Sequence, residues 1–226
     1  MVALTWSCEG TNATTVTTGN SGMDAVAIGT GGTIVYDTSN QLFGTSCVKV
    51  QTGTGTATEA AWSTQLGTVT TLYARWYLKL GFTPGANNRL FQGMCAGSQS
   101  GFGFDLSTTR TLITKNAGNG TWGTTAAIPL NQWVRVEMDV PAFSTTTGAP
   151  VLRLYLSPHS TTADSTISGT NQNIGANCTF FRLPIRTASW GPIYYDEIKL
   201  DTAGQPGPLP DPTAVQRGQF FPFLTA

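Results

Sequence analysis

The sequence is poor in charge and in long apolar runs. Only 11% of the 226 residues are Asp, Glu, Lys or Arg, and the formal net charge is zero. A nucleic-acid-binding protein needs a basic surface to neutralise phosphates, and the sequence has no basic stripe. It also lacks an apolar stretch of membrane-spanning length and the basic start of a signal peptide. We therefore expect neither nucleic acid nor membrane as a partner, and we expect the protein to stay in the cytoplasm where it is made.

Cysteine is scarce and scattered. Cys8, Cys47, Cys95 and Cys178 include no Cys-x-x-Cys pair, which excludes the common zinc and redox motifs. Free cysteine is usually buried, so we predict buried free thiols. The alternative is a disulfide between Cys8 and Cys47, which requires an oxidising final location.

Apolar residues spaced three and four apart over a helical length are also lacking, whereas short alternating runs between turn residues recur. The clearest strands cover residues 71–80, 132–140 and 151–157. Their alternation turns one set of side chains inward: Leu72, Trp76, Leu78, Val134, Val136, Met138, Leu152, Leu154 and Leu156. Weaker candidates cover residues 33–37, 47–51, 58–64, 89–95, 101–106, 110–115 and 178–183. The pattern predicts an all-β protein of two packed antiparallel sheets.

The composition changes after residue 201. Residues 202–226 contain five of the twelve prolines, which favour an extended chain over a sheet strand. We predict a sandwich over residues 1–201 and an extended C-terminal arm over residues 202–226. The arm ends in an apolar cluster, which we expect to dock on another subunit or a neighbouring copy: Phe220, Phe221, Phe223 and Leu224. The alternative is that the arm folds back as a lid over its own sandwich.

The stretch YYDEIKLD, residues 194–201, holds three of the twelve acidic residues. Strict strand alternation places Asp196 on the same face as Ile198 and Leu200. A carboxylate facing a core is costly unless it is paired, hydrogen-bonded or metal-bound. Asp196 is therefore either a satisfied structural acid or part of a site.

The outward side chains of the three clearest strands form a candidate glycan-binding strip if those strands are neighbours. Aromatic rings stack on the apolar faces of sugars, and arginine offers forked donors to hydroxyls and carboxylates. The alternative is an ordinary solvated or subunit-facing sheet, since the same residue types are enriched in protein interfaces. The residues of this strip are Tyr73, Arg75, Tyr77, Trp133, Arg135, Glu137, Arg153 and Tyr155.

Catalytic signals are weak. Glu137 and Asp139 share a strand face at about 7 Å, whereas a retaining glycanase places two carboxylates about 5 Å apart. The alternative is two surface acids opposite basic neighbours. His159, the single histidine, falls in a loop sequence, and neither a serine-hydrolase elbow nor a phosphate-binding loop is present. We therefore expect a protein that is not an enzyme.

With these strands placed, the chain from about Glu9 to Asp201 resembles the concanavalin A-like or laminin G-like jelly-roll sandwiches found among bacteriophage structural proteins. The segments that carry the resemblance are CEGTNATTVTTGNSG, YDTSNQLFGTSCVKV, LYARWYLKL, LNQWVRVEMDV and YYDEIKLD. The resemblance implies a two-sheet jelly roll. It does not determine the function, because lectins, carbohydrate-binding modules, glycanases, lyases and purely structural subunits share this fold.

The resemblance also suggests a structural calcium ion. Related carbohydrate-binding modules hold calcium between an acid near the first strand and an acid in the last strand, which correspond here to Glu9 and Asp196. Calcium takes about six to eight oxygen ligands, so carbonyl groups and residues such as Asn12 or Asn20 would have to contribute. The alternative is that Asp196 pairs with an arginine or caps a turn.

The resulting hypothesis is a non-enzymatic bacteriophage virion protein with a lectin-like fold, placed on the capsid or the tail. Its expected partners are other virion subunits or copies of itself, and host-surface polysaccharide. We expect it in the virion, after assembly in the host cytoplasm. The alternatives are a free-standing carbohydrate-binding module and a polysaccharide-degrading enzyme.

Overall fold

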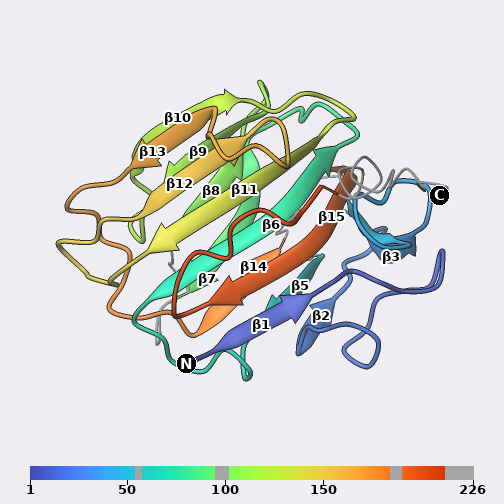
Figure 1. Ribbon diagram of the computed structural model, residues 1–226, viewed down its shortest axis with the longest axis horizontal. Helices are drawn as coiled ribbons and strands as arrows, with labels where there is room; N and C mark the ends of the chain where they lie inside the picture. The colour runs from blue at the N-terminus through green and yellow to red at the C-terminus, as the bar shows by residue number, and fades with distance from the viewer. Residues whose placement is uncertain (54–57, 95–101, 184–189, 212–226) are drawn as a thin grey trace, which may run out of the picture.

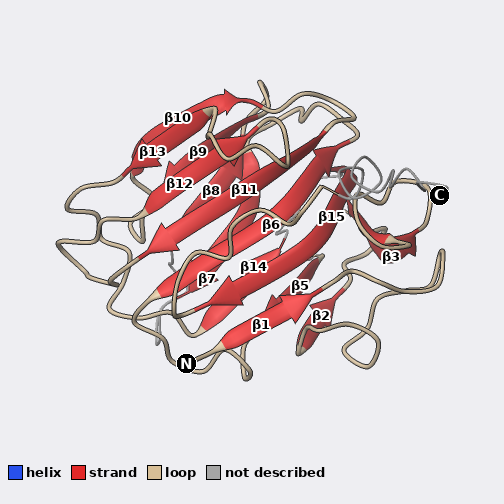
Figure 2. Ribbon diagram, viewed as in Figure 1, coloured by secondary structure: helices blue, strands red, loops and turns tan. Residues whose placement is uncertain are grey.

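The computed structural model describes residues 1–53, 58–94, 102–183 and 190–211. Within these ranges the chain forms fifteen strands in two antiparallel sheets and contains no helix (Figure 2). The described part accordingly offers no helix long and apolar enough to cross a membrane. The predicted all-β fold, a two-sheet antiparallel jelly-roll sandwich, is confirmed.

One sheet has eight strands and faces the viewer in Figure 1. Its order is β13-β12-β11-β6-β15-β4-β3, and β1 pairs with β15 outside this path. The strands are β1 (Ala3–Trp6), β3 (Thr33–Asp37), β4 (Cys47–Thr52), β6 (Leu72–Leu80), β11 (Trp133–Val140), β12 (Val151–Tyr155), β13 (Ser165–Ser168) and β15 (Trp190–Asp201).

The other sheet has seven strands and lies behind the first (Figure 1). Its order is β10-β9-β8-β7-β14-β5-β2, so β14 inserts between two strands that precede it by more than eighty residues. The strands are β2 (Ala25–Ala27), β5 (Glu59–Trp62), β7 (Asn88–Met94), β8 (Gly103–Leu106), β9 (Thr111–Lys115), β10 (Thr121–Ala127) and β14 (Phe180–Leu183).

The core between the sheets consists of the side chains that alternation turned inward. Eight of the nine predicted inward residues are buried, and Leu156 is partly buried against them. Trp76 on β6 joins the two sheets, since its ring packs on Phe91, Phe104 and Phe181 at centroid distances of 5.4, 5.7 and 6.2 Å. Burial of each such ring contributes on the order of 1.5 to 3 kcal/mol.

The described cysteines agree with the free-thiol prediction. Cys8 and Cys47 are buried free thiols and Cys178 is also buried, whereas Cys95 lies outside the described residues. Burial, together with the nearby Asp196 carboxylate, raises the pKa of the Cys47 thiol to about 12. The same two causes, burial first, raise the pKa of Cys8 well above its ordinary value. Both groups therefore stay protonated at neutral pH.

Candidate functional site

The strands β6, β11 and β12 are neighbours, as the candidate strip requires (Figure 1). Arg135 on β11 lies between Tyr77 on β6 and Tyr155 on β12. Two residues further along β11, Glu137 pairs with residue 75 on one side and residue 153 on the other. Tyr73 and Trp133 continue the strip in opposite directions. The register thus brings all eight strip residues to the outer face of the eight-stranded sheet.

Most of this strip is covered rather than exposed. Arg75 and Glu137 are each 3% exposed, and Arg135 is 1% exposed. Tyr77 and Tyr155 are also buried. The rest of the strip is half-buried, namely Tyr73, Trp133 and Arg153. As the chain is folded here, the central strip residues are out of reach of a soluble partner.

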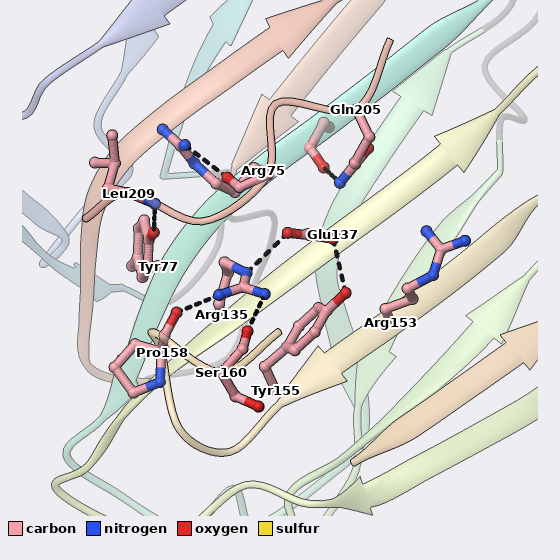
Figure 3. A network of polar contacts seen from close by, with 12 residues as sticks. Arg75, Tyr77, Arg135, Glu137, Arg153, Tyr155, Pro158, Ser160, Gln205 and Leu209 are labelled. Carbon is pink, nitrogen blue, oxygen red and sulfur yellow. Dashed lines mark hydrogen bonds and ion pairs between the residues drawn. The ribbon is translucent and has the colours of Figure 1, made fainter. Parts of the chain in front are cut away.

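The first covering segment follows β12 and closes over Arg135 (Figure 3). The guanidinium donates Nη1 to the carbonyl of Pro158 and Nη2 to that of Ser160, the latter at 2.7 Å. Its Nε donates to Glu137 Oε1 at 2.8 Å, and Tyr155 donates its hydroxyl to Glu137 Oε2 at 2.9 Å. The guanidinium also lies 3.7 Å from the Tyr155 ring centroid. Each charge in this pair therefore has several partners, which a buried ion pair needs.

The Tyr155 phenol acts as a donor in this network. Burial and then the Glu137 charge raise its pKa. A tyrosine that serves as a catalytic base must lose its proton near neutral pH. The geometry and the direction of this pKa therefore favour a structural role.

The second covering segment is the start of the C-terminal arm. After β15 the chain turns back and runs over the outer face of the eight-stranded sheet (Figure 1). Arg75 Nη1 donates to the Gly207 carbonyl at 2.8 Å, and the Leu209 N–H donates to the Tyr77 hydroxyl at 2.8 Å. In its described part, residues 202–211, the arm thus folds back over its own sandwich. The cluster predicted to dock on a partner lies outside the described residues: Phe220, Phe221, Phe223 and Leu224.

The third covering segment is the loop between β3 and β4. Trp133 Nε1 donates to the Asn40 carbonyl at 3.0 Å. Phe43 packs edge-on against Tyr77 at a centroid distance of 4.9 Å and against His159 at 5.6 Å. His159 lies in a loop, as predicted, and its ring helps to hold two of the covering segments together. These three segments bury the outer face of the eight-stranded sheet. We call this second buried region, which is lined by polar and aromatic side chains, the polar interior.

Asp196 belongs to this polar interior because β15 contains a one-residue bulge. Asp196 pairs with Tyr77, but Lys199 pairs with Arg75, so β15 uses one residue more than β6 over this interval. Glu197 lies in the bulge with a φ of 46°. A bulge changes which face the following side chains occupy.

The prediction that Asp196 shares the face of Ile198 and Leu200 is therefore wrong. The two apolar residues lie in the core between the sheets, whereas Asp196 lies on the outer face beneath the loop between β3 and β4. Its Oδ2 accepts hydrogen bonds from the N–H groups of Leu42 and Phe43 at 2.9 and 3.0 Å. Asp196 thus caps a turn of that loop, which is one of the alternatives to metal binding given in the sequence analysis.

The environment of Asp196 opposes ionisation. Its Oδ1 is buried with no hydrogen-bond partner. Burial raises the pKa of this carboxyl to about 7 against the opposing effect of the two N–H donors, and the charges of Glu197 and Glu9 raise it further. Burial and Glu9 also raise the pKa of Glu197, although Arg75 acts in the opposite direction. The middle of β15 therefore gathers acidic groups that repel one another.

The neighbouring carboxylate of Glu9 is already engaged. Thr45 donates its N–H at 3.1 Å and its hydroxyl at 2.6 Å to Glu9 Oε2. The described residues contain no group of three His, Cys, Asp or Glu side chains placed to hold a metal ion. Calcium requires about six to eight oxygen ligands. The arrangement at Glu9 and Asp196 therefore fits two acids that are hydrogen-bonded to the loop between β3 and β4 better than it fits the calcium site that the resemblance suggests.

The two acids considered for catalysis are both ion-paired. Asp139 accepts from Arg153 Nη1 on the neighbouring strand, and Glu137 is held by Arg135 and Tyr155. This matches the alternative of two acids opposite basic neighbours, with one difference: Glu137 is buried rather than at the surface.

The outer face of the seven-stranded sheet carries a polar cluster that the sequence analysis missed. Arg182 on β14 donates to Glu59 on β5 at 2.9 Å and to Gln92 on β7 at 2.5 Å. A second group joins Arg89, Asp105 and Lys115, with Arg89 Nε 2.6 Å from the Asp105 carboxylate. The charged side chains of both groups are 14–20% exposed. The available signal was that each of these short apolar strands contains one charged residue. Which of these residues become neighbours depends on the order of the strands in the sheet.

Structural comparison identifies sandwich proteins of similar fold. The chain superposes on an endo-β-1,4-glucuronan lyase from the fungus Trichoderma reesei with a TM-score of 0.61 and 16% identity, covering 85% of this chain and 94% of the lyase. For a cellulose-induced protein, Cip1, the TM-score is 0.58 at 14% identity, covering 81% and 90% of the two chains. For a carbohydrate esterase from the Shiga toxin-encoding bacteriophage phi24B it is 0.51 at 13% identity, covering 76% and 87%.

Sequence comparison gives no such match. No protein-family model matches this chain, and no curated protein matches it either. At 13–16% identity the three structures establish the sandwich fold alone.

Proposed function

We propose that this protein is a non-enzymatic bacteriophage virion surface protein, a capsid decoration or minor tail protein, that contacts host-surface polysaccharide. The observation that carries the non-enzymatic part is the closure of the outer face over Glu137 by the chain itself. Both oxygens of Glu137 are hydrogen-bonded inside the protein. A catalytic acid or base must come within hydrogen-bonding reach of the substrate, which Glu137 cannot do beneath its cover.

The virion part of the proposal is supported by the segments that resemble phage jelly-roll proteins and by the likeness to the phage phi24B esterase. The polysaccharide part is supported by the carbohydrate chemistry named for two of the three neighbours, a glucuronan lyase and a carbohydrate esterase.

The outer face of the seven-stranded sheet is the better glycan-binding surface of the two. Its arginine and lysine side chains keep solvent contact, whereas the central strip residues do not. On a glycan array we expect Arg89→Ala with Lys115→Ala to abolish binding and Trp133→Ala to leave it unchanged. If Trp133→Ala alone abolishes binding, the strip rather than this face contacts the sugar.

The direct test of the virion role is the composition of purified particles. We expect quantitative mass spectrometry to find the protein at a fixed copy number per particle and immunogold labelling to place it on the capsid or the tail surface. A protein that is made during infection but is absent from washed particles would contradict the proposal. Glycan binding by such a protein would instead support the carbohydrate-binding module.

A polysaccharide-degrading enzyme is the second candidate, because the likeness to the glucuronan lyase spans 94% of that chain. The assay is release of reducing ends or unsaturated products from host polysaccharides, with Glu137→Gln as the test variant and Glu59→Gln as its matched control on the other sheet. We expect no product from the unmodified protein. Product formation that Glu137→Gln abolishes and Glu59→Gln retains would establish the enzyme.

A further inference from the structure

The described start of the arm binds the sheet as a peptide ligand would. We call residues 203–211 the strap. Three hydrogen bonds join it to β6, and each involves a side chain rather than a strand-to-strand backbone pair. Besides the contacts of Arg75 and Tyr77, Gln205 Nε2 donates to the Ala74 carbonyl at 3.4 Å. The strap is thus held at one strand surface, and it does not extend the sheet.

The sequence of the strap explains this mode of binding. Its centre is Pro206-Gly-Pro-Leu-Pro210, in which the prolines lack N–H donors and favour an extended chain. The backbone groups that remain available include the carbonyl of Gly207 and the N–H of Leu209. Arg75 and Tyr77 bind these two groups. Aromatic and polar surfaces recognise proline-rich peptides in the same general way, because such peptides lose little entropy on binding.

Contacts within the sandwich position the two side chains that the strap binds. The Tyr77 ring is fixed by the edge of Phe43 at 4.9 Å. The Arg75 guanidinium lies 5.5 Å from the Tyr77 ring centroid, and its Nε is buried with no hydrogen-bond partner. The Gly207 carbonyl of the strap accepts from Nη1 of the same guanidinium, and a buried arginine needs such acceptors.

The strap is attached through a short connection. Thr202 still belongs to the sandwich, since its N–H donates to the Val2 carbonyl at 3.0 Å. Ala203, the first strap residue, is exposed and is followed by Gly204. A change of direction at these two residues would point the strap away without disturbing β15, which ends at residue 201.

We propose that the Arg75–Tyr77 surface is a docking site for the proline-rich strap, and that copies of this chain exchange straps by each binding the strap of a neighbour. A neighbour's strap makes the same hydrogen bonds as the chain's own strap. A chain's own strap has the advantage of a high effective concentration at the docking site. Exchange loses only this advantage, and the loss is smaller when copies are held close together. This inference goes beyond the proposed virion role and can be tested on the purified chain.

The docking site is tested in trans. The chain ending at residue 204 keeps all fifteen strands and lacks most of the strap, and its fold is checked by circular dichroism and melting. We expect a synthetic peptide of residues 203–211 to bind it saturably by fluorescence anisotropy. Tyr77→Phe in the chain, or N-methylation of Leu209 in the peptide, should each weaken binding about five- to tenfold, the effect of one hydrogen bond. Tyr73→Phe on the same strand face is the control and should leave binding unchanged.

Exchange is tested with two complementary chains. The acceptor ends at residue 204, and the donor is full-length with Arg75→Ala and Tyr77→Phe, so only the donor's strap and the acceptor's surface are intact. We expect them to form a complex in sedimentation, and Leu209→Pro in the donor to abolish it. Should the shortened chain fail to fold, concentration-dependent self-association of the full-length protein, lost in its Leu209→Pro variant, provides the measurement. A folded acceptor that does not bind the peptide overturns the docking site, and full-length chains that stay monomeric at millimolar concentration overturn the exchange.

Discussion

Replacing Asp196 by Asn should make the protein more stable at neutral pH and leave it nearly unchanged in acid. The folded protein binds the Asp196 proton more tightly than the unfolded chain does, because the pKa is about 7 when folded and 3.8 ordinarily. The free energy of unfolding therefore falls as the pH rises through this interval. Asparagine keeps an oxygen to accept the N–H groups of Leu42 and Phe43 but never ionises.

The size of the effect follows from the two pKa values. A rise from 3.8 to about 7 corresponds to about 4 kcal/mol of unfolding free energy. Over the accessible range from pH 5 to pH 7, the stability difference between Asp196→Asn and the unmodified protein should grow by about 2 to 3 kcal/mol. Glu197, whose pKa is also raised, is present in both proteins and largely cancels in this difference.

The assay is urea unfolding of both proteins at several pH values in the presence of EDTA, so that bound calcium makes no contribution. Asp24→Asn is the control of opposite sign. Burial acts to raise the pKa of Asp24, but the N–H groups of Ser63 and Gln65 at 2.7 and 2.6 Å outweigh it, and the pKa is lowered. The stability contributed by Asp24 is therefore present at neutral pH and lost in acid. A stability difference for Asp196→Asn that stays constant from pH 5 to pH 8 would refute the argument.

Further predictions concern the two interiors. Arg135→Met leaves Glu137 buried without its cation and should cost about 3 to 5 kcal/mol in urea unfolding, whereas Arg153→Met at a partly exposed pair should cost less than about 1 kcal/mol; equal losses would mean that burial does not distinguish the pairs. Tyr155→Phe removes one hydrogen bond to a carboxylate and should cost about 1.5 to 3 kcal/mol; no loss would argue against that bond. Trp76→Ala should cost about 3 to 5 kcal/mol through the cavity it leaves, and an intact melting temperature would contradict the packing described. Millimolar calcium against EDTA should leave the melting temperature unchanged, whereas a rise would support the calcium site.

The alternation of β6, β11 and β12 was predictable because their inner faces are continuously apolar. Residues such as Leu78 and Val136 leave one possible register with respect to the core. The strands missed were β1, β2, β10 and β13. Three of them, β1, β2 and β13, are only three or four residues long, and β10, with the sequence TWGTTAA, offers no apolar alternation. Such strands form because neighbouring strands and loops hold them, which a single sequence does not reveal.

The polar site was predictable in its composition and not in its accessibility. The eight strip residues were identified from alternation. Of the three covering segments, only the C-terminal arm was considered as a cover, as the alternative to docking on a partner, because the other two loops have no regular pattern that predicts their path over the sheet. The bulge at Glu197 has no signal in YYDEIKLD, and one extra residue moved Asp196 to the other face. The cluster around Arg182 depends on β14 lying between β7 and β5, an order that only the folded chain establishes.

The strap also bears on how the protein folds as it is synthesised. Gly207 and Leu209 contact residues of β6 that precede them by 132 positions, so these contacts form only after all fifteen strands have been synthesised. Until then, that part of the sheet surface is open to solvent. Because it is built from arginine and tyrosine hydroxyl groups rather than aliphatic side chains, it stays hydrated instead of adhering to other nascent chains. This part of the sheet can therefore remain uncovered until residues 203–211, or those of a neighbouring copy, bind to it.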